Sequence, residues 1–341
     1  MKGNIKNNVW GEDMIKRPEV SIICCTYNDE QYIRDSLNSL LGQKTNFPIE
    51  ILIHDDASTD NTAAIIREYE KVYPQIIKPI FQKDNQYSKG IDVQQINYER
   101  ARGKYIAICN GSDYWIDEYK LQRQYDYLEK TKNCVLSVHA GKLIDVNGKY
   151  LNDLCAPSKM NKFYNTLELI KGESGLFATN SMFFRSSIVK SRPSLFMNMP
   201  VTDYVLILYL SLFGQVHYMR DVMSCHRVGV QEYREIAQIA SGETDKQHFQ
   251  GIGEWLLLFD EWTNYSFHDS IEAKLNANGF IYTTKQNDYK EIDAMSLRKE
   301  YISVPSRSKL FVLLEQHLPQ LAGMLKRKRL LMYQLRYRRN N

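Results

Sequence analysis

Two consecutive strand-and-helix patterns near the start of the chain constrain the fold most. Residues 20–25 form a nearly continuous apolar run with β-branched side chains, which is typical of a parallel strand buried on both faces. A polar loop follows, and apolar residues then recur at helical spacing up to Gly42. Residues 49–54, 55–60 and 64–73 repeat the strand, the polar turn and the helix. Right-handed crossovers between such strands predict an α/β fold with a largely parallel sheet.

Later segments extend this sheet and make it mixed. Further strands are expected at residues 76–81, 105–108, 134–140, 142–145, 180–185 and 215–219, and helices at 118–128 and 203–213. Asn147 and Gly148 predict a hairpin turn. Beyond Gly242 the apolar residues follow a helical period, at Ile252, Trp255, Leu256, Phe259 and Trp262 and again between 310 and 318. We therefore predict an N-terminal extension at 1–17, an α/β domain at 18–235 and a helical region at 236–341.

Composition limits the classes of function. The chain has 341 residues, with 44 Lys and Arg against 40 Asp and Glu, and this balance argues against a nucleic-acid-binding surface. No apolar segment approaches the roughly 18 residues that span a bilayer, and residues 1–17 lack the apolar core of a signal peptide. The six cysteines have neither zinc-site nor disulfide spacing. We expect a cytoplasmic protein.

Three polar clusters follow predicted strands, at residues 26–29, 55–60 and 110–113. Because the carboxyl ends of parallel strands meet at one edge of a sheet, these clusters are expected to lie together. Asp55 and Asp56 are adjacent carboxylates, which repel each other unless hydrogen-bond donors or a ligand satisfy them. The alternative is a purely structural role, in which such residues cap the following helices. We expect this role for the three residues Ser58, Thr59 and Asp60.

The chain resembles bacterial glycosyltransferases of family 2, which have the nucleotide-diphospho-sugar transferase fold called GT-A. The matching segments are Val20-Ser-Ile-Ile-Cys-Cys-Thr-Tyr-Asn28, Asp55-Asp-Ala-Ser-Thr-Asp-Asn-Thr62, and residues 85–90, 102–107, 110–115, 120–122, 179–184 and 223–229. They cover residues 18–230 in the family's order, which is more specific than any one motif. The resemblance implies a GT-A sheet, mixed but mainly parallel and flanked by helices, with a helical C-terminal extension.

The resemblance also implies a nucleotide site. Tyr27 would stack on the nucleobase, Asp56 would accept a hydrogen bond from a base N–H, and Thr26 would line the pocket. Arg227 would lie near the diphosphate; its alternative role is a surface salt bridge. A loop aromatic packed on the first helix is the corresponding alternative for Tyr27.

The family's acidic motif is incomplete in this chain. It usually reads Glu-Gly-Asp-Asp-Tyr-Trp, whereas this chain has Asn110-Gly-Ser-Asp-Tyr-Trp115. Asp113 is therefore the predicted ligand for a divalent metal, Mn²⁺ or Mg²⁺, with diphosphate oxygens completing the set. The alternative is that Asp113 caps the following helix in a site that has lost its metal. His226 replaces the family's usual Tyr and is not assigned as a ligand.

The predicted general base is Asp203. It lies in Thr202-Asp203-Tyr204, where relatives have Gly-Asp-Tyr at the start of a helix. Asp203 would take a proton from an acceptor hydroxyl as that oxygen attacks the sugar opposite the leaving diphosphate, which gives inversion. It would also suit the N-cap of the apolar helix that follows.

These features predict an inverting glycosyltransferase, peripheral on the membrane, that uses a nucleotide sugar, expected to be UDP-linked, to extend a surface polysaccharide or a lipid-linked glycan. A degenerate, non-catalytic homologue that binds nucleotide or a partner is the second hypothesis, favoured by Asn110 and Ser112. A nucleotidyltransferase, the third, would normally carry a glycine-rich basic loop after the first strand. Residues 325–339 alternate basic and apolar side chains, which predicts a helix on an anionic membrane, against its own domain or on an acidic partner.

Overall fold

The computed structural model describes residues 17–89, 91–172, 176–190, 192–193, 202–229 and 243–285. They belong to two compact units, one within residues 1–237 and one within 238–341, and each is described separately. The predicted boundary at 235 is not tested by this division and remains a prediction.

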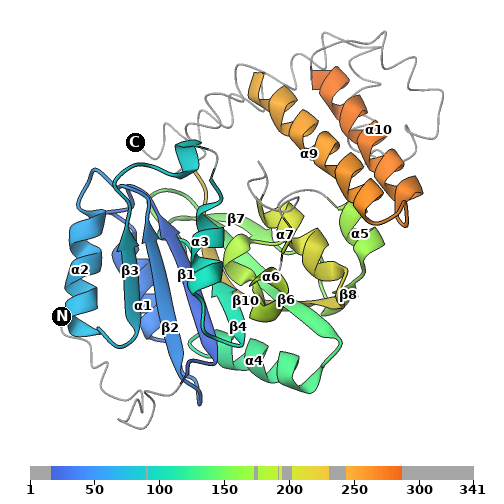
Figure 1. Ribbon diagram of the computed structural model, residues 1–341. Helices are drawn as coiled ribbons and strands as arrows, with labels where there is room; N and C mark the ends of the chain where they lie inside the picture. Colours follow the sequence, from blue (N-terminus) through green and yellow to red (C-terminus); the bar gives the residue numbers. More distant parts are fainter. Residues whose placement is uncertain are drawn as a thin grey trace. The chain divides into compact units, whose positions relative to one another are not determined.

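The first half of the larger unit is a parallel α/β sheet (Figure 1). Its elements are β1 (Val20–Thr26), α1 (Ile33–Leu41), β2 (Ile49–Asp55), α2 (Thr62–Val72), β3 (Ile77–Phe81), the 3-10 turn η2 (Tyr87–Lys89), α3 (Val93–Arg100) and β4 (Tyr105–Ile108). The strands lie in the order β3-β2-β1-β4, all parallel. Val20 in the central strand β1 pairs with both Ile49 and Tyr105.

The second half adds a mixed extension to the same sheet. Its elements are β5 (Tyr114–Trp115), α4 (Lys120–Lys130), β6 (Cys134–Ile144), β7 (Tyr150–Cys155), β8 (Lys162–Tyr164), α5 (Thr166–Lys171), the 3-10 turn η3 (Thr179–Ser181), β9 (Phe183–Arg185), α6 (Ser186–Lys190), α7 (Thr202–Ser211) and β10 (Gln215–Arg227). The order continues β4-β9-β6-β10-β5, with β7 beside β6 and β8 beside β10. Since β9 is antiparallel to both of its neighbours and β6 is parallel to β10, the predicted mixed, mainly parallel sheet is confirmed.

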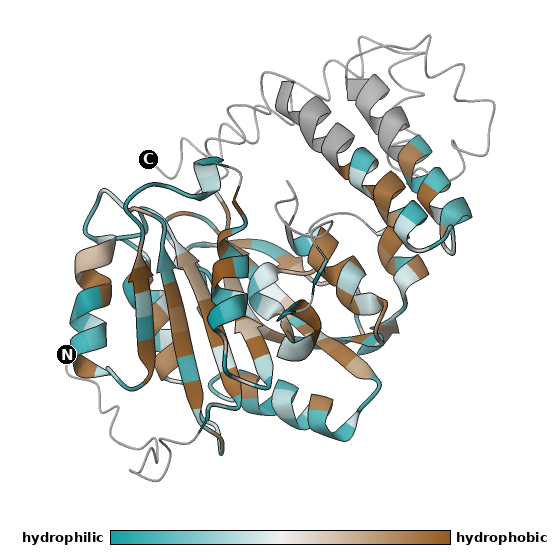
Figure 2. Ribbon diagram, viewed as in Figure 1, coloured by the Kyte–Doolittle hydropathy of each residue, from teal (hydrophilic) through white to brown (hydrophobic). Residues whose placement is uncertain are grey.

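Helices cover both faces of the central strands, whose successive side chains point to opposite faces of the sheet. Ile22 and Ile51 belong to one apolar cluster that includes Leu37 of α1, Ile66 of α2 and Leu121 of α4. On the opposite face, α3 packs on the strands. Figure 2 shows the apolar residues concentrated along the central strands, as burial on both faces requires.

Several predicted elements differ from the structure. The two strands predicted at 134–140 and 142–145 are one strand, β6 (Cys134–Ile144), and the predicted strand at 180–185 begins with the turn η3. Strand β10 continues past its predicted end at residue 219 to Arg227. The prediction ended it too early because register shifts near Met219 and Val222 interrupt the alternation of the strand. Helix α3 was not predicted, since its buried face includes Gln95 and Asn97 and shows no apolar period.

The second unit contains two described helices, α9 (Glu243–Trp262) and α10 (His268–Lys285), which pack on each other. Four of the five predicted apolar positions are buried, while Trp262 is 46% exposed. Within the described residues, no helix is long and apolar enough to cross a membrane. The predicted apolar residues at 310–318 and the basic segment at 325–339 lie outside the described residues.

Candidate active site

The loop after β1 is joined to the loop after β2 by hydrogen bonds. Asn28, in the left-handed region at φ 55°, donates its amide to the Ser58 hydroxyl at 2.9 Å. Its side-chain oxygen accepts from the Thr59 amide at 2.8 Å. The expectation that Ser58 and Thr59 cap α2 is therefore wrong, because these residues bind the neighbouring loop instead. Asp60 serves both, since it accepts from the amides of Glu30 and Thr62 at 3.0 and 2.9 Å.

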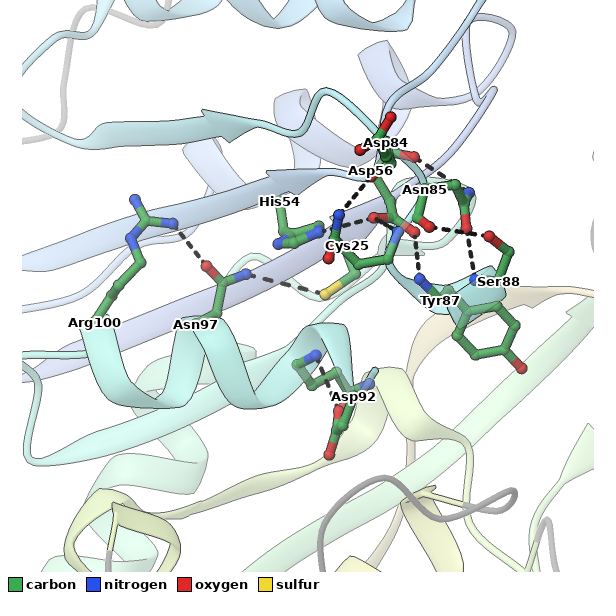
Figure 3. A network of polar contacts seen from close by, with 12 residues as sticks. Cys25, His54, Asp56, Asp84, Asn85, Tyr87, Ser88, Asp92, Asn97 and Arg100 are labelled. Carbon is green, nitrogen blue, oxygen red and sulfur yellow. Dashed lines mark hydrogen bonds and ion pairs between the residues drawn. The ribbon is translucent and has the colours of Figure 1, made fainter. Parts of the chain in front are cut away.

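Asp56 anchors the segment after β3 (Figure 3). Its carboxylate is buried and accepts from the amides of Gln86 at 2.8 Å and Tyr87 at 3.0 Å. The Nε2 atom of His54 lies 3.2 Å from the same carboxylate, and Asn85 donates its side-chain amide to the Asp56 carbonyl. One carboxylate therefore fixes the turn that carries Tyr87, whose side chain is 63% exposed.

Burial shifts the pKa values of the two residues before Asp56, which are His54 and Asp55. It raises the pKa of the Asp55 carboxyl, an effect that hydrogen bonds from Ser58 partly offset, and among the described residues Asp55 Oδ1 has no hydrogen-bond partner. Burial also lowers the pKa of His54, which the contact with Asp56 partly offsets. A neutral His54 that donates through Nε2 fits this position, since Asp56 supplies the acceptor.

Close contact joins the ends of β1 and β4. The Thr26 hydroxyl donates to Asp29 at 2.7 Å, and a Cβ atom on Gly111 would lie 2.4 Å from that hydroxyl and 2.6 Å from the Asp29 carboxylate. Glycine is required at position 111 for this approach. Burial raises the pKa of Asp29 to about 6, with the charge of Asp113 acting in the same direction and the Thr26 hydroxyl opposing. Tyr27 lies in this loop, partly buried.

Asp113 directly precedes β5 and contacts the end of the neighbouring strand, β10. Its buried carboxylate accepts from the Arg227 amide at 2.9 Å, and His226 Nδ1 lies 3.1 Å from both of its oxygens. The alternative that Asp113 caps α4 is wrong, because its partners are on β10 and the N-cap of α4, Tyr119, makes no side-chain cap. Sequence reasoning did not identify His226 as this partner.

The Arg227 side chain connects three loops. Its guanidinium donates to the carbonyls of Ser112, Asp145 and Val146 at 3.0, 3.1 and 3.2 Å, and it lies 4.4 Å from the centre of the Tyr32 ring. Since the residue is 6% exposed, the alternative of a surface salt bridge is wrong. This arginine holds the turn before Asp113 against the loop after β6.

Asp203 lies at the start of α7. One carboxylate oxygen accepts from the Tyr204 amide at 2.8 Å, and the other accepts from the Thr179 hydroxyl at 3.2 Å. Among the described residues, no ion pair neutralises this carboxylate. Thr179, on η3, is a second partner that sequence reasoning did not assign.

The metal-binding potential of the site is limited to a pair. Within the described part of the chain, no group of three or more His, Cys, Asp and Glu side chains is placed to hold a metal ion. Asp113 and His226 bring one carboxylate and one imidazole together, a combination that suits Mn²⁺ only if a bound diphosphate supplies further oxygens.

The fold and these loops define the GT-A class of nucleotide-sugar transferases. S. aureus TarS 1–349 in complex with UDP-GlcNAc is similar in fold, with a TM-score of 0.57 and 17% identity over 87% of each chain. The mannosyltransferase PcManGT from Pyrobaculum calidifontis, in complex with GDP-Man and Mn²⁺, has a TM-score of 0.55 and 13% identity over 93% of this chain and 81% of its own.

Residues 21–191 match the family described as Glycosyl transferase family 2, and the chain belongs to this family. An uncharacterised protein of Mycobacterium tuberculosis is 31% identical over 210 residues, which are 61% of this chain and 58% of the relative. The putative teichuronic acid biosynthesis glycosyltransferase TuaG of Bacillus subtilis is 32% identical over 136 residues, 40% of this chain and 52% of that protein. The chain thus spans little more than half the length of these relatives.

Proposed function

We propose that this protein is an inverting glycosyltransferase that moves a sugar from a UDP-linked donor to a hydroxyl group of a glycan or lipid-linked acceptor in surface polysaccharide synthesis. The observation that carries the proposal is the set of hydrogen bonds around the Asp203 carboxylate. Its carboxylate is held by a hydroxyl and an amide and is not neutralised by any ion pair among the described residues. A carboxylate held in this way can accept a proton.

The donor nucleotide would bind at the carboxyl ends of β1 and β2. Tyr27 would stack on the base, Thr26 would line the pocket, and Asp56 would accept from a base N–H. A carboxylate has about four acceptor positions, so the three donors that already contact Asp56 leave one for the base. The exposed Tyr87 lies on the turn that Asp56 holds and would give this pocket a second aromatic wall.

The diphosphate would lie toward Asp113. Asp113 and His226 would hold a divalent cation, Mn²⁺ or Mg²⁺, which supplies positive charge to the leaving diphosphate. Arg227 contributes by fixing the turn at Ser112 beside that diphosphate.

The transfer step that we propose uses these residues in the following order. Asp203 takes the proton of the acceptor hydroxyl as its oxygen forms a bond to the anomeric carbon. The bond from that carbon to the diphosphate oxygen breaks on the opposite face, and the nucleoside diphosphate leaves with the electron pair. Attack opposite the leaving group inverts the anomeric configuration.

A degenerate homologue that binds nucleotide without turnover is the second candidate. The substitutions Asn110 and Ser112 favour it, since two of the family's acidic groups are missing beside Asp113. Incubation with UDP-GlcNAc, UDP-glucose, UDP-galactose and GDP-mannose, with and without Mn²⁺, separates the two candidates. Release of nucleoside diphosphate from any of these sugars supports the transferase; nucleotide binding without release from any of them supports the homologue.

The relative TuaG supports a polysaccharide acceptor, because its name assigns it to teichuronic acid biosynthesis. For location we propose a cytoplasmic protein that associates with the inner face of the cell membrane through residues 325–339. Seven Lys and Arg residues between 326 and 339 alternate there with Leu and Tyr, and each is worth about 1 kcal/mol near an anionic surface.

A further inference from the structure

Asn180 is a completely buried amide with three hydrogen bonds to two separate strands. Its Nδ2 donates to the Cys225 carbonyl at 2.9 Å, and its Oδ1 accepts from the Ser224 hydroxyl at 2.8 Å. Its main-chain carbonyl accepts from the Trp115 indole N–H at 2.9 Å. An amide with partners on both sides of its side chain is held in one orientation.

These bonds fix the segments that carry Asp113 and its partners. Cys225 directly precedes His226 and Arg227, the two residues that contact Asp113. Trp115 lies two residues after Asp113 and pairs with Ser224 between β5 and β10. Asn180 therefore lies where the two segments around Asp113 join.

The residue before Asn180 leads to the proposed base. Thr179 donates its hydroxyl to Asp203 at 3.2 Å. Thr179 and Asn180 are neighbours on the short turn η3. One turn thus connects the Asp113 and His226 pair to Asp203, with Asn180 fixed on β10 and β5 and Thr179 fixed on α7.

We propose that Asn180 is a positioning residue that sets the spacing between Asp203 and the Asp113 and His226 pair. The proposal rests on the function proposed above. Asn180 touches no substrate; it acts through Thr179 on the base and through Cys225 on the strand end. A displacement of about 1 Å in a reacting group lowers the rate of a positioned reaction by about 100-fold. Loss of the Asn180 bonds therefore lowers turnover more than it lowers nucleotide binding.

The matched variants are Asn180→Asp, Ser224→Ala and Ser186→Ala. Asn180→Asp keeps the shape and the acceptor of the amide but loses the donor to Cys225 when ionised, and Ser224→Ala removes the donor to Asn180. Ser186 is the control, because it is also a buried serine whose hydroxyl donates to a carbonyl, that of Gly103 at 2.6 Å. Its bond is remote from Asp113 and Asp203 in the hydrogen-bond network.

The experiment measures kcat and KM of the full chain with the nucleotide sugar that supports turnover, together with UDP affinity by calorimetry, below the melting temperature of each variant. We expect kcat to fall roughly 10- to 100-fold in Asn180→Asp at pH 8 and by about tenfold in Ser224→Ala. UDP affinity should stay within about twofold, because Arg227 still holds Asp113. Ser186→Ala should keep the wild-type kcat.

Acid pH provides a rescue that a merely structural role would not give. Only the protonated carboxyl of Asn180→Asp can donate to the Cys225 carbonyl, and burial favours that form. The ratio of variant to wild-type kcat should therefore rise as pH falls from 8 to 6. A constant ratio, or wild-type kcat in both Asn180→Asp and Ser224→Ala, overturns the inference alone. A wild-type protein that releases nucleoside diphosphate from no sugar overturns the proposed function and this inference together.

Discussion

His226 Nδ1 lies 3.1 Å from both carboxylate oxygens of Asp113, although the two residues are 113 positions apart in the sequence. The imidazole lies where the family usually has a tyrosine, and beside an acidic motif that has lost two carboxylates. The pair brings a nitrogen donor to the one carboxylate that remains. Its contribution to metal and nucleotide binding can be measured directly.

Asp113→Ala should abolish Mn²⁺-dependent UDP binding, and Ser112→Asp should tighten it, because each changes the number of carboxylates at the site. His226→Phe should weaken Mn²⁺-dependent binding about tenfold or more, because the cation loses one of the two side chains proposed to hold it. Calorimetry of UDP with and without Mn²⁺ measures all three. His217→Phe is the control, since His217 is a buried histidine on the same strand, stacked on Tyr127. Equal Mn²⁺ binding by Asp113→Ala and wild type would show that the metal assignment is wrong.

Asp203→Asn should retain UDP binding while sugar transfer falls by roughly 10²-fold or more, the scale of general-base loss. The amide keeps the size of the side chain but cannot accept the proton. The rate of UDP release in the presence of acceptor measures the effect. The control is Asp126→Asn on α4, because Asp126 is an exposed aspartate, and this change should leave the rate unaltered. A transfer rate in Asp203→Asn equal to that of wild type removes Asp203 from this role.

Asp56→Ala should weaken UDP binding by about 10- to 100-fold, because the turn with Tyr87 loses its anchor and the base loses an acceptor. Hydrogen bonds to a charged group are each worth about 1.5–3 kcal/mol, which corresponds to this range. Asp84→Ala, in the same loop, changes a carboxylate whose side chain is 72% exposed and should alter UDP affinity less than about twofold. Similar affinities for the two variants would contradict the assignment of Asp56.

Acid pH should destabilise the fold through His217. Burial lowers the pKa of this histidine to about 4 from its ordinary value of 6.5. The unfolded chain therefore binds a proton that the folded chain does not, so the contribution to stability is full above pH 6.5 and is lost as pH falls toward 4. His217→Phe keeps the stacked ring and removes the titration. Between pH 7 and pH 5 the variant should lose about 2 kcal/mol less unfolding free energy than wild type in urea; parallel losses would contradict this.

The 341-residue chain should sediment with anionic vesicles, should not sediment with neutral ones, and should be released as salt rises, because basic residues between 326 and 339 attract anionic headgroups. A form truncated after Met324 should not bind. Equal sedimentation of the two forms would show that this segment is not the membrane contact.

The strands of the fold that the sequence predicts well are those whose side chains are buried on both faces of the sheet. Strands β1, β2 and β4 are buried on both faces, so their apolar runs are continuous and their ends are clear. Helix α3 was missed because Asn97 buries its amide on the Leu52 carbonyl, and a buried polar face leaves no apolar period.

The candidate site was predictable only in its loops. Parallel strands place Thr26 beside Asp55, so the meeting of the first two clusters follows from the strand pattern. The partners of the aspartates do not follow from it. His226, at the end of β10, contacts Asp113, and Thr179, on the turn η3, contacts Asp203 on α7. A single sequence carries no signal for such contacts between separate segments. These contacts became visible only in the folded chain.

The late position of β10 in the sequence also bears on how the sheet forms during synthesis. Strands β1 to β4 are available once residue 108 has been made, whereas Asp113 finds its partners only after residue 227. Because chains fold from the N-terminus as they emerge, the loops proposed to hold the nucleotide can form well before the strand that contacts Asp113. Until β10 arrives, β6 lacks its parallel neighbour and presents an open edge. We therefore expect the growing chain to be most prone to pair with other chains over the interval between β6 and β10.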